Sequence, residues 1–275
     1  MNGFHLASRL LKTAITLSQV PEAAAGPFVL RSPLPDAFAT AAAIGFDAAE
    51  LFLPAADFIS VDEVKELAAT HGLAIAAIGT GAGMLRHGLS ITDANEEKRE
   101  AALDFVFSMI DFGGQLAAPA ILGSMQGKPT HEGALDQLAA GLRRCGERAA
   151  SHGVPFIYEP LNRYETNLFN RLANAARFLE SRDLKNVVLL ADLFHMNIEE
   201  HDLAAAIRQA GRHVGHVHFA DSNRQAMGFG HTDPAPVIAA LREIHYTGFL
   251  SAEIFPLPDP MTAARQTISS IRSLI

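Results

Sequence analysis

Eight short apolar segments alternate with longer segments of helical character, and this alternation constrains the fold more than any other feature. Each segment is apolar throughout, which is typical of parallel strands that are buried on both faces. Alternating strands and helices indicate an α/β fold with a parallel sheet. Eight strands within 275 residues favour a closed (β/α)8 TIM barrel, a single domain over residues 1–275. The predicted strands are Thr13–Leu17, Ala48–Leu53, Ala74–Ile78, Ala120–Leu122, Val154–Glu159, Val187–Ala191, His213–Phe219 and Phe249–Glu253.

The segments between these strands read as helices and loops. Ser60 and Asp62 offer a helix N-cap and Gly72 a stop, so a helix is predicted over Val61–His71. The stretch Val20–Pro35 is expected to be irregular, and Gly79–Asn95 to be a loop. Further helices are predicted before Ala43 and over Glu96–Phe112, Glu132–His152, Phe169–Ser181, Leu203–Ala210, Pro236–His245 and Met261–Ile275. A doubly wound open sheet is the alternative fold, but no glycine-rich dinucleotide fingerprint opens a first helix.

Charge and composition exclude several classes of function. The net charge of −8 argues against a nucleic-acid surface, which needs a basic patch, and against an anionic membrane. Cys145 is the only cysteine, so an internal disulfide and a thiolate metal cluster are excluded. No apolar run reaches membrane-spanning length, and Met1–Thr16 lacks the layout of a secretory signal. A soluble cytoplasmic protein is therefore expected.

Four successive predicted strands end in a potential metal ligand: Glu159, Asp192, His218 and Glu253. The carboxyl ends of barrel strands carry the active site in TIM-barrel enzymes, and adjacent strands lie roughly 5 Å apart. Three carboxylates and one imidazole cannot share a dry pocket comfortably without a cation. A set rich in oxygen and free of sulfur suits Mn²⁺, Mg²⁺ or Co²⁺ better than a structural zinc. The alternatives are an ordinary solvated glutamate, a satisfied core histidine, and Asp192 as a helix cap.

The same residues lie in stretches that resemble a known family. The stretches are Glu159–Glu165, Asp192–Glu200, His216–Arg224 with Gly228–His231, and Ala252–Glu253. In order and spacing they resemble the xylose-isomerase-like TIM-barrel superfamily of sugar isomerases and epimerases. Within it the likeness is greatest to the ketose 3-epimerases of the D-tagatose and D-psicose 3-epimerase type and to 5-keto-L-gluconate epimerase.

The resemblance implies a role for each of seven residues. Glu159, Asp192, His218 and Glu253 would bind one divalent metal ion, Mn²⁺ first, with Mg²⁺, Co²⁺ or Zn²⁺ as alternatives. Glu159 and Glu253 would also be the catalytic acid and base, and Glu165, His195 and Arg224 would bind the sugar. The implied enzyme is a metal-dependent ketose or keto-acid 3-epimerase that acts through a metal-bound cis-enediolate. Its partner would be a small sugar or keto-sugar acid, and the implied assembly is a homo-oligomer, a dimer or tetramer.

The chemistry of the residues agrees with this assignment. Epimerisation beside a carbonyl needs a base on one face of the carbon and an acid on the other, and carboxylates from two strands can flank a bound sugar. A metal would polarise the carbonyl and stabilise the enediolate. Arg224 offers a forked set of donors.

Structural roles outside a binding site are the alternatives for several of these residues. Glu165 could pair with Arg163 on the surface, His195 could cap its own helix, and Arg224 could be a solvated loop residue. His216 is interpreted as structural, and Glu50 as facing a helix or satisfying a loop. Two sets complete the candidates: Gln126 and Lys128 as contacts to a substrate carboxylate or phosphate, and Phe52, Met84, Leu85 and Phe229 as walls for the sugar.

Four other functions compete with epimerisation. An aldose–ketose or hydroxypyruvate-type isomerase would share the enediolate, and a lyase like inosose dehydratase would use the same base and metal to expel a hydroxyl. An apurinic endonuclease of this fold needs three zinc ions and further histidines, whereas Gly79 and Gly123 follow the third and fourth strands. A sugar-binding barrel without catalysis would not need the paired carboxylates.

Overall fold

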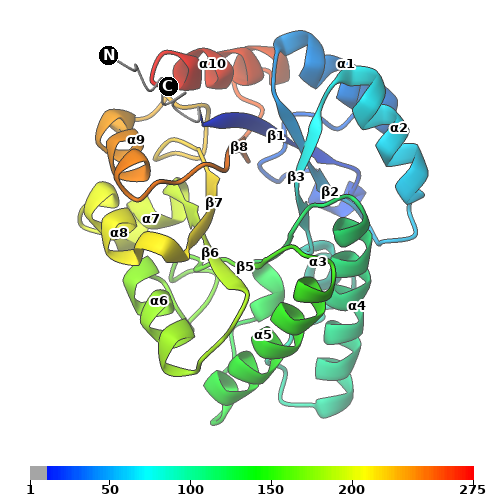
Figure 1. The fold of residues 1–275 in the computed structure, drawn as a ribbon, viewed down its shortest axis with the longest axis vertical. Helices are drawn as coiled ribbons and strands as arrows, with labels where there is room; N and C mark the ends of the chain where they lie inside the picture. Colours follow the sequence, from blue (N-terminus) through cyan, green and yellow to red (C-terminus); the bar gives the residue numbers. More distant parts are fainter. Residues whose placement is uncertain (1–10) are drawn as a thin grey trace, which may run out of the picture.

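Every strand of the sheet pairs in parallel with the next strand along the chain, and β8 pairs with β1 to close a barrel in the order β1 to β8 (Figure 1). The computed structural model describes residues 11–275, so the expectation for Met1–Thr16 falls mostly outside them. The predicted (β/α)8 barrel in one domain is confirmed. The strands are β1 Lys12–Ser18, β2 Ala48–Phe52, β3 Ala74–Gly79, β4 Ala120–Leu122, β5 Phe156–Tyr158, β6 Val187–Asp192, β7 Val214–His218 and β8 Phe249–Ala252.

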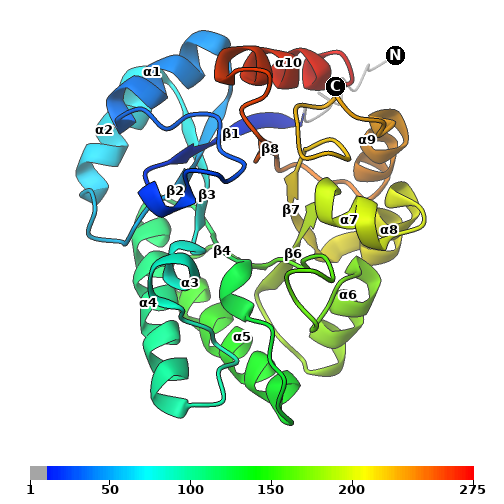
Figure 2. The same ribbon diagram turned by 180° about the vertical axis from the view of Figure 1, so that it is seen from behind.

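Helices form a ring around the barrel in both face-on views (Figures 1 and 2). The long ones are α1 Leu34–Ile44, α2 Val61–His71, α4 Glu96–Gln115, α5 Ala134–Ser151, α6 Leu172–Ser181, α8 Leu203–Ala210, α9 Pro234–Glu243 and α10 Pro260–Arg272. Short helical turns complete the set: α3 Ala82–His87, α7 Leu193–Glu199, and the 3-10 turns η1 Pro21–Ala23, η2 Ser124–Gln126 and η3 Gly211–His213. Among the described residues no helix is both long and apolar enough to cross a membrane.

Helix ends follow the local chemistry of the sequence. The Ser60 hydroxyl accepts a hydrogen bond from the backbone of Glu63, whose carboxylate accepts one from the Ser60 backbone, which completes a capping box for α2. Gly72 ends the helix in the left-handed conformation that glycine adopts without strain (φ 65°). Aspartates cap three later helices, Asp202 before α8, Asp233 before α9 and Asp259 before α10.

The hydrophobic core is divided among several clusters, and two groups of them position the site. Large clusters fill the layer between the outer face of the strands and the ring of helices. A small separate cluster of Ala77, Ile121, Ile157 and Leu190 belongs to the inner faces of β3 to β6. Because side chains two apart share a face of a strand, Ile157 and Leu190 lie directly below Glu159 and Asp192. The barrel interior therefore has an apolar floor under the candidate ligands.

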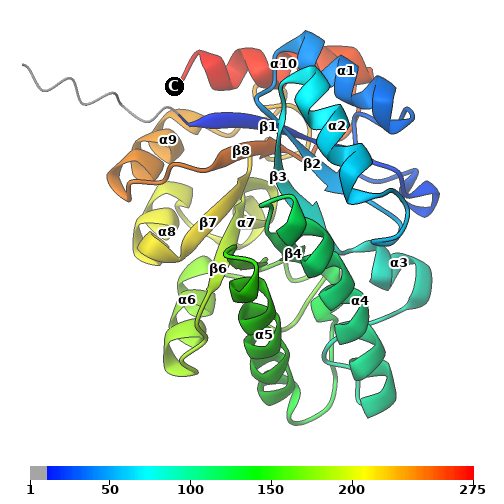
Figure 3. The same ribbon diagram turned by 45° about the vertical axis from the view of Figure 1, so that its right-hand side comes forward.

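Two helices lie where the sequence predicted no helical range, although a helix after Asp192 was among the alternatives. The predicted loop Gly79–Asn95 contains α3, where glycines allow close packing: a Cβ on Gly83 would lie 2.6 Å from the sulfur of Met125. The other, α7, begins immediately after β6 and is capped by Asp192. In the view turned by 45°, α3 and the segment after β1 lie near each other, and α3 contacts η1 (Figure 3). Both of these helices, α3 and α7, lie at the carboxyl ends of strands, where chain segments cover the pocket described next.

Candidate active site

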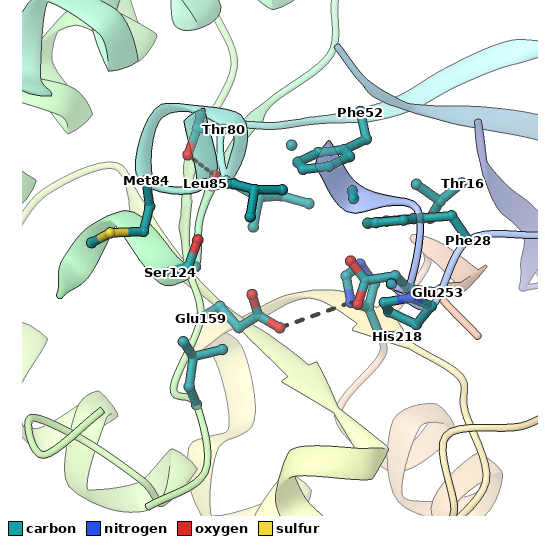
Figure 4. Close-up of a pocket in the computed structure, with 18 of the residues that line it drawn as sticks. Thr16, Phe28, Phe52, Thr80, Met84, Leu85, Ser124, Glu159, His218 and Glu253 are labelled. Atoms are coloured by element: carbon teal, nitrogen blue, oxygen red, sulfur yellow. Dashed lines mark hydrogen bonds and ion pairs between the residues drawn. The ribbon is translucent and has the colours of Figure 1, made fainter. Parts of the chain in front are cut away.

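A pocket of about 460 Å³ opens at the carboxyl ends of the strands. Phe52 and Gly79 at the ends of β2 and β3, Glu159 after β5, and His218 and Glu253 from β7 and the end of β8 all line it (Figure 4). Of the seven residues proposed from the sequence, six line this pocket directly. The seventh, Asp192, is fully buried behind His218 and His195.

The four proposed ligands converge as predicted. Nδ1 of His218 lies 3.3 Å from Asp192 Oδ2 and 3.8 Å from both Glu159 Oε1 and Glu253 Oε2. Figure 4 shows the Glu159 carboxylate directed toward His218 and Glu253. One atom of each of Asp192, His218 and Glu253 lies within 4.8 Å of the others, and the same holds for Glu159, Asp192 and His195.

Asp192 caps a helix and also faces the other proposed ligands, so the two interpretations of this residue are compatible. Its Oδ1 accepts the backbone N–H groups of Phe194 (2.8 Å) and His195 (3.4 Å) and so caps α7. Its Oδ2 remains for His218 and the pocket. Burial opposes ionisation of this carboxyl, but His195, His218 and Arg224 outweigh burial and hold its pKa below the usual value. Asp192 is therefore an anion that is fixed in place by a helix terminus.

The pKa of Glu159 shifts in the opposite direction to that of Asp192. Burial, followed by the charges of Asp192 and Glu253, raises the pKa of Glu159 well above its usual value despite the opposing charge of His218. Among residues 11–275 no hydrogen bond to its carboxylate is found. Gly123 leaves it room, because a Cβ at that position would lie 2.5 Å from Glu159 Oε2. This carboxyl group is therefore free to hold a proton or a cation.

His195 presents one nitrogen to the protein and the other to the pocket. Its Nδ1 accepts from the backbone N–H of Asn162 at 3.3 Å, and the Asn162 side-chain nitrogen lies 2.8 Å away. Burial lowers the pKa of His195, so the neutral ring carries its proton on Nε2. That nitrogen lies 3.7 Å from Asp192 Oδ2 and 3.8 Å from Glu159 Oε1. His195 therefore does not cap its helix, and its position suits a donor in the pocket.

Arg224 is buried rather than solvated. Its guanidinium pairs with Glu253, lies 3.7 Å from Asp192 Oδ2, and stacks 4.9 Å from the ring centre of Phe194. The backbone has φ 60°, an uncommon conformation for a residue with a side chain that often occurs at functional sites. Its Nε is buried without a hydrogen-bond partner. Arg224 therefore places positive charge directly against two of the proposed ligands.

Glu165 does not pair with Arg163, as one interpretation had it. Its Oε1 accepts a hydrogen bond from Asn162 Nδ2 at 2.8 Å and lies 3.7 Å from His195 Nδ1. The Arg163 guanidinium binds the buried carboxylate of Glu199 instead, at 2.9 Å from each oxygen. Glu165 therefore stays at the pocket with its side chain 43% exposed.

The interpretation of Glu50 was wrong. Its side chain faces the barrel interior, is nearly inaccessible to solvent, and lies 2.7 Å from His216 Nε2 and 3.1 Å from His218 Nε2. Burial opposes its ionisation, but His218 and His216 outweigh burial and hold the pKa of Glu50 well below the usual value. The interpretation of His216 as structural agrees with this contact. No local pattern predicts this pairing, because one glutamate in an apolar strand does not reveal which face of the strand it occupies.

Gln126 and Lys128 do not face the pocket. Gln126 is fully buried, and its Nε2 donates to the backbone oxygens of Gly123 and Glu159, both at 2.9 Å. It also accepts from the Tyr158 hydroxyl at 2.8 Å, so it fastens the end of β4 to the end of β5. Lys128 donates to backbone oxygens of the loop after β5. Neither residue lines the pocket in which a substrate would bind.

Phenylalanines supply an apolar wall. Phe28 and Phe52 stack with ring centres 4.8 Å apart and lie on the other side of the pocket from Glu159 (Figure 4). Met84 and Leu85 of α3 also line the pocket, whereas Phe229 does not. Phe28 was missed because it comes from the irregular stretch after β1. A position just beyond the carboxyl end of a strand is the only sequence signal that marks it.

The donor set fits a divalent metal ion. Three carboxylates and one imidazole nitrogen meet without sulfur, which suits a hard divalent cation. Glu50 already occupies the far nitrogen of His218, as an outer carboxylate does in many histidine-ligated metal sites.

Comparison with known proteins identifies the family of this chain. The family model described as "Xylose isomerase-like TIM barrel" matches residues 38–274. L-ribulose 3-epimerase of Methylomonas sp. is 32% identical over 225 residues, 80% of this chain and 77% of that protein. D-psicose 3-epimerase of Clostridium cellulolyticum, solved with D-tagatose, superposes with a TM-score of 0.79 at 22% identity, over 96% and 99% of the two chains. A 3-keto-D-glucoside 4-epimerase of Escherichia coli gives 0.78 at 25% identity, over 95% and 100%. The chain therefore belongs to the xylose isomerase-like TIM barrel family and has ketose 3-epimerases and a keto-glucoside 4-epimerase among its homologues.

Proposed function

We propose that this protein is a divalent-metal-dependent ketose 3-epimerase, with Glu159 and Glu253 as the acid–base pair. The observation that carries the proposal is the meeting of four side chains from successive strands in one pocket. Glu159 Oε1 and Glu253 Oε2 each lie 3.8 Å from the same nitrogen of His218. The two glutamates come from the ends of β5 and β8, which β6 and β7 separate in the barrel.

We assign the ion to Glu159, Asp192, His218 and Glu253, with Mn²⁺ as the first choice. A bound ion would supply a Lewis acid that polarises the ketone of the substrate. Asp192 suits the role of metal ligand because capping α7 holds its carboxylate in one orientation. His218 suits it because Nδ1 faces the three carboxylates.

The two glutamates exchange the proton of the carbon beside the ketone. One carboxylate removes the C3 proton, and the electron pair moves into the carbonyl to form an enediolate. The carboxylic acid of the other glutamate then protonates C3 on the opposite face, and the ketone re-forms. Because the reaction is reversible, each glutamate is the base for one of the two epimers. In the metal-free protein, burial and the charges of Asp192 and Glu253 raise the pKa of Glu159, so its carboxylate is stabilised by a neighbouring cation.

His195 and the residues at the rim would orient the sugar. The Nε2–H of His195 points into the pocket and would donate to the oxygen on which charge develops. Glu165 and Arg224 would bind hydroxyl groups. Arg224 is the only lysine or arginine among the described residues that line the pocket, and its guanidinium already pairs with Glu253. A carboxylate or phosphate would therefore find no unpaired cation, which favours a neutral ketose over a keto-acid.

Deuterium exchange tests the reaction. The purified protein would be stripped of metal, reloaded with Mn²⁺, and incubated with a panel of ketoses, keto-acids and keto-glycosides in D₂O. After removal of the ion by a chelator, NMR would locate the label and chromatography would identify the product. We expect deuterium at C3 and the C3 epimer as product.

Other outcomes would replace this function with a named alternative. Label at C1 or C2 without label at C3 would mean aldose–ketose isomerisation. Loss of water would mean a lyase, and inversion at C4 of a keto-glycoside would mean a 4-epimerase. Binding without exchange of any substrate proton would leave a sugar-binding barrel. Three zinc ions per chain in metal analysis would support the endonuclease.

Assembly and location are part of the same proposal. We propose a cytoplasmic homo-oligomer, a dimer or tetramer. Sedimentation velocity of the metal-loaded protein tests the assembly, and a single species with the mass of one chain, 29.4 kDa, would contradict it.

A further inference from the structure

Glu50 lies on β2, yet its carboxylate meets two histidines of β7 inside the barrel. The two strands are not neighbours in the barrel, and 166 residues separate Glu50 from His216. Oε2 of Glu50 lies 2.7 Å from His216 Nε2, and Oε1 lies 3.1 Å from His218 Nε2. All three side chains are buried. Glu50 lies at the base of the pocket that it helps to line, and its carboxylate is engaged by its neighbours in the barrel interior.

His218 is held at both of its ring nitrogens. Nε2 donates to Glu50, while Nδ1 lies 3.3 to 3.8 Å from Asp192, Glu159 and Glu253. A hydrogen bond at one nitrogen decides which nitrogen carries the proton and which has the free electron pair. We propose that Glu50 is a positioning residue that keeps His218 protonated on Nε2, with the lone pair of Nδ1 aimed at the candidate metal centre.

The neighbours of Glu50 prevent it from turning away. Thr16 Oγ1 on β1 donates to Glu50 Oε1 at 3.1 Å, and His216 donates to the other oxygen. The ring of His216 also packs edge-on against the ring of His218, with centres 5.5 Å apart. Both oxygens of Glu50 are thus engaged. The carboxylate has one orientation, and it transmits that orientation to His218.

Glu50, His216 and His218 lie within hydrogen-bond distance of one another, since their nitrogens and oxygens approach to between 2.7 and 3.3 Å. We interpret each contact as a hydrogen bond from an imidazole N–H to the carboxylate, because the other nitrogen of His218 faces the larger group of Asp192, Glu159 and Glu253. Glu50 then acts on the candidate metal centre through His218.

The consequence is a specific loss of metal affinity when Glu50 is changed. Removing an outer hydrogen-bond partner of a metal-binding histidine typically costs 10–100-fold in affinity. Glu50→Gln keeps the size of the side chain but removes its charge and offers only one oxygen to two imidazole donors. We expect Mn²⁺ to bind this variant about 10–100-fold more weakly than the wild type.

Glu199→Gln is the matched control. Glu199 is also a buried glutamate with a charged partner, but that partner is Arg163 and not a histidine of the site. Mn²⁺ affinity would be measured for the full-length wild type and both variants by isothermal titration and by electron paramagnetic resonance, and thermal unfolding would be measured without metal. We expect both variants to unfold at a lower temperature and only Glu50→Gln to lose affinity by tenfold or more.

An affinity of Glu50→Gln within threefold of the wild type would overturn the inference, as would an equal loss in both variants. If Glu50→Gln does not fold, an NMR measurement on the wild-type protein tests the inference instead. Long-range ¹H–¹⁵N NMR of Zn²⁺-loaded, histidine-labelled protein reports which nitrogen of each ring is protonated. We expect Nε2 of His218 to be protonated, and the opposite tautomer would refute the proposal.

The inference rests on the metal centre of the proposed function, but the two fail separately. None of these measurements uses a sugar. A protein that binds the ion with the expected affinities but exchanges no ketose proton would refute the epimerase and leave the role of Glu50 standing.

Discussion

Gly123 lies against Glu159 so closely that a Cβ on Gly123 would be 2.5 Å from Glu159 Oε2. The glycine follows β4, and the glutamate follows β5, the next strand of the barrel. The Glu159 backbone N–H donates to Leu122 at 3.0 Å, so the two strand ends are also tied together through the backbone. The position of the carboxylate therefore depends on the lack of a side chain at residue 123.

Gly123→Ala should displace the Glu159 carboxylate while leaving the barrel intact. Misplacing a reacting group by about 1 Å can cost 10²-fold in rate, so we expect kcat/KM to fall by about that factor. Steady-state kinetics at saturating Mn²⁺ would measure the fall, and circular dichroism would confirm the fold. Wild-type activity in this variant would show that the carboxylate does not need this space.

Replacing each pocket glutamate by glutamine separates catalysis from binding. Proton transfer by a positioned side chain is worth about 10²–10⁴-fold, so Glu159→Gln and Glu253→Gln should each lower kcat by at least 10²-fold. Glu165→Gln is the control, because Glu165 contacts Asn162 and lies beside the far nitrogen of His195. We expect this variant to raise KM more than it lowers kcat. A normal rate of deuterium exchange at C3 in either of the first two variants would remove that glutamate from the mechanism.

The barrel and the convergence of the four proposed ligands could be predicted because both depend on local patterns. Apolar strands of even spacing define the fold, and a polar residue at the end of such a strand must lie at the rim of the barrel. Glu159, Asp192, His218 and Glu253 follow this rule and meet within a few ångströms.

Other parts of the site depend on contacts that the sequence does not encode locally. Glu50 interrupts an apolar strand, and only the observed register places it on the inner face, against histidines far along the chain. Phe28 reaches the pocket because an irregular segment folds over the barrel mouth. The backbone N–H of Asn162 donates to Nδ1 of His195 and so decides which ring nitrogen is unprotonated. A backbone group can do this in any residue type, so the sequence does not predict it. These are tertiary contacts, whereas strand ends are local features.

Metal binding should release protons and strengthen as the pH rises. Burial and the charges of Asp192 and Glu253 raise the pKa of Glu159 well above its usual value, so the metal-free protein keeps a proton there to a higher pH than an ordinary glutamate does. Burial opposes protonation of His218, but Glu50, Asp192 and Glu253 outweigh it and raise the pKa of His218 well above its usual value. Both groups must lose their protons to bind a metal, so below the two raised pKa values the affinity grows with pH.

Isothermal titration in two buffers of different ionisation enthalpy counts the protons released. We expect protons to be released when Mn²⁺ binds, and fewer for Glu159→Gln than for the wild type, because glutamine carries no acidic proton. Affinity that is independent of pH, or proton uptake on binding, would contradict the proposed ligand set.

Asp221 holds the loop that carries Arg224, and this dependence can be measured. The buried carboxylate of Asp221 accepts four backbone N–H groups, from Ser222, Gly228, Gly230 and Thr232, at 2.7 to 3.0 Å. Burial opposes ionisation of Asp221, but these hydrogen bonds outweigh it and lower its pKa. Since the lowered value lies below 3.8, the stabilisation is complete above that pH and is lost only as the pH falls through the folded value.

Asp221→Asn should therefore destabilise the protein at pH 7 by about 1–3 kcal/mol, the net worth of hydrogen bonds to a charged group. It should also raise KM, because the loop would no longer hold Arg224 against Glu253 and Asp192. Arg224→Ala should raise KM by itself without weakening Mn²⁺ binding, since it removes positive charge from beside two proposed ligands. A double-mutant cycle tests whether the two substitutions raise KM independently. If Asp221 acts through Arg224, the double variant should have nearly the KM of Arg224→Ala alone. Fully additive increases in KM would mean that the loop contacts the sugar independently of Arg224.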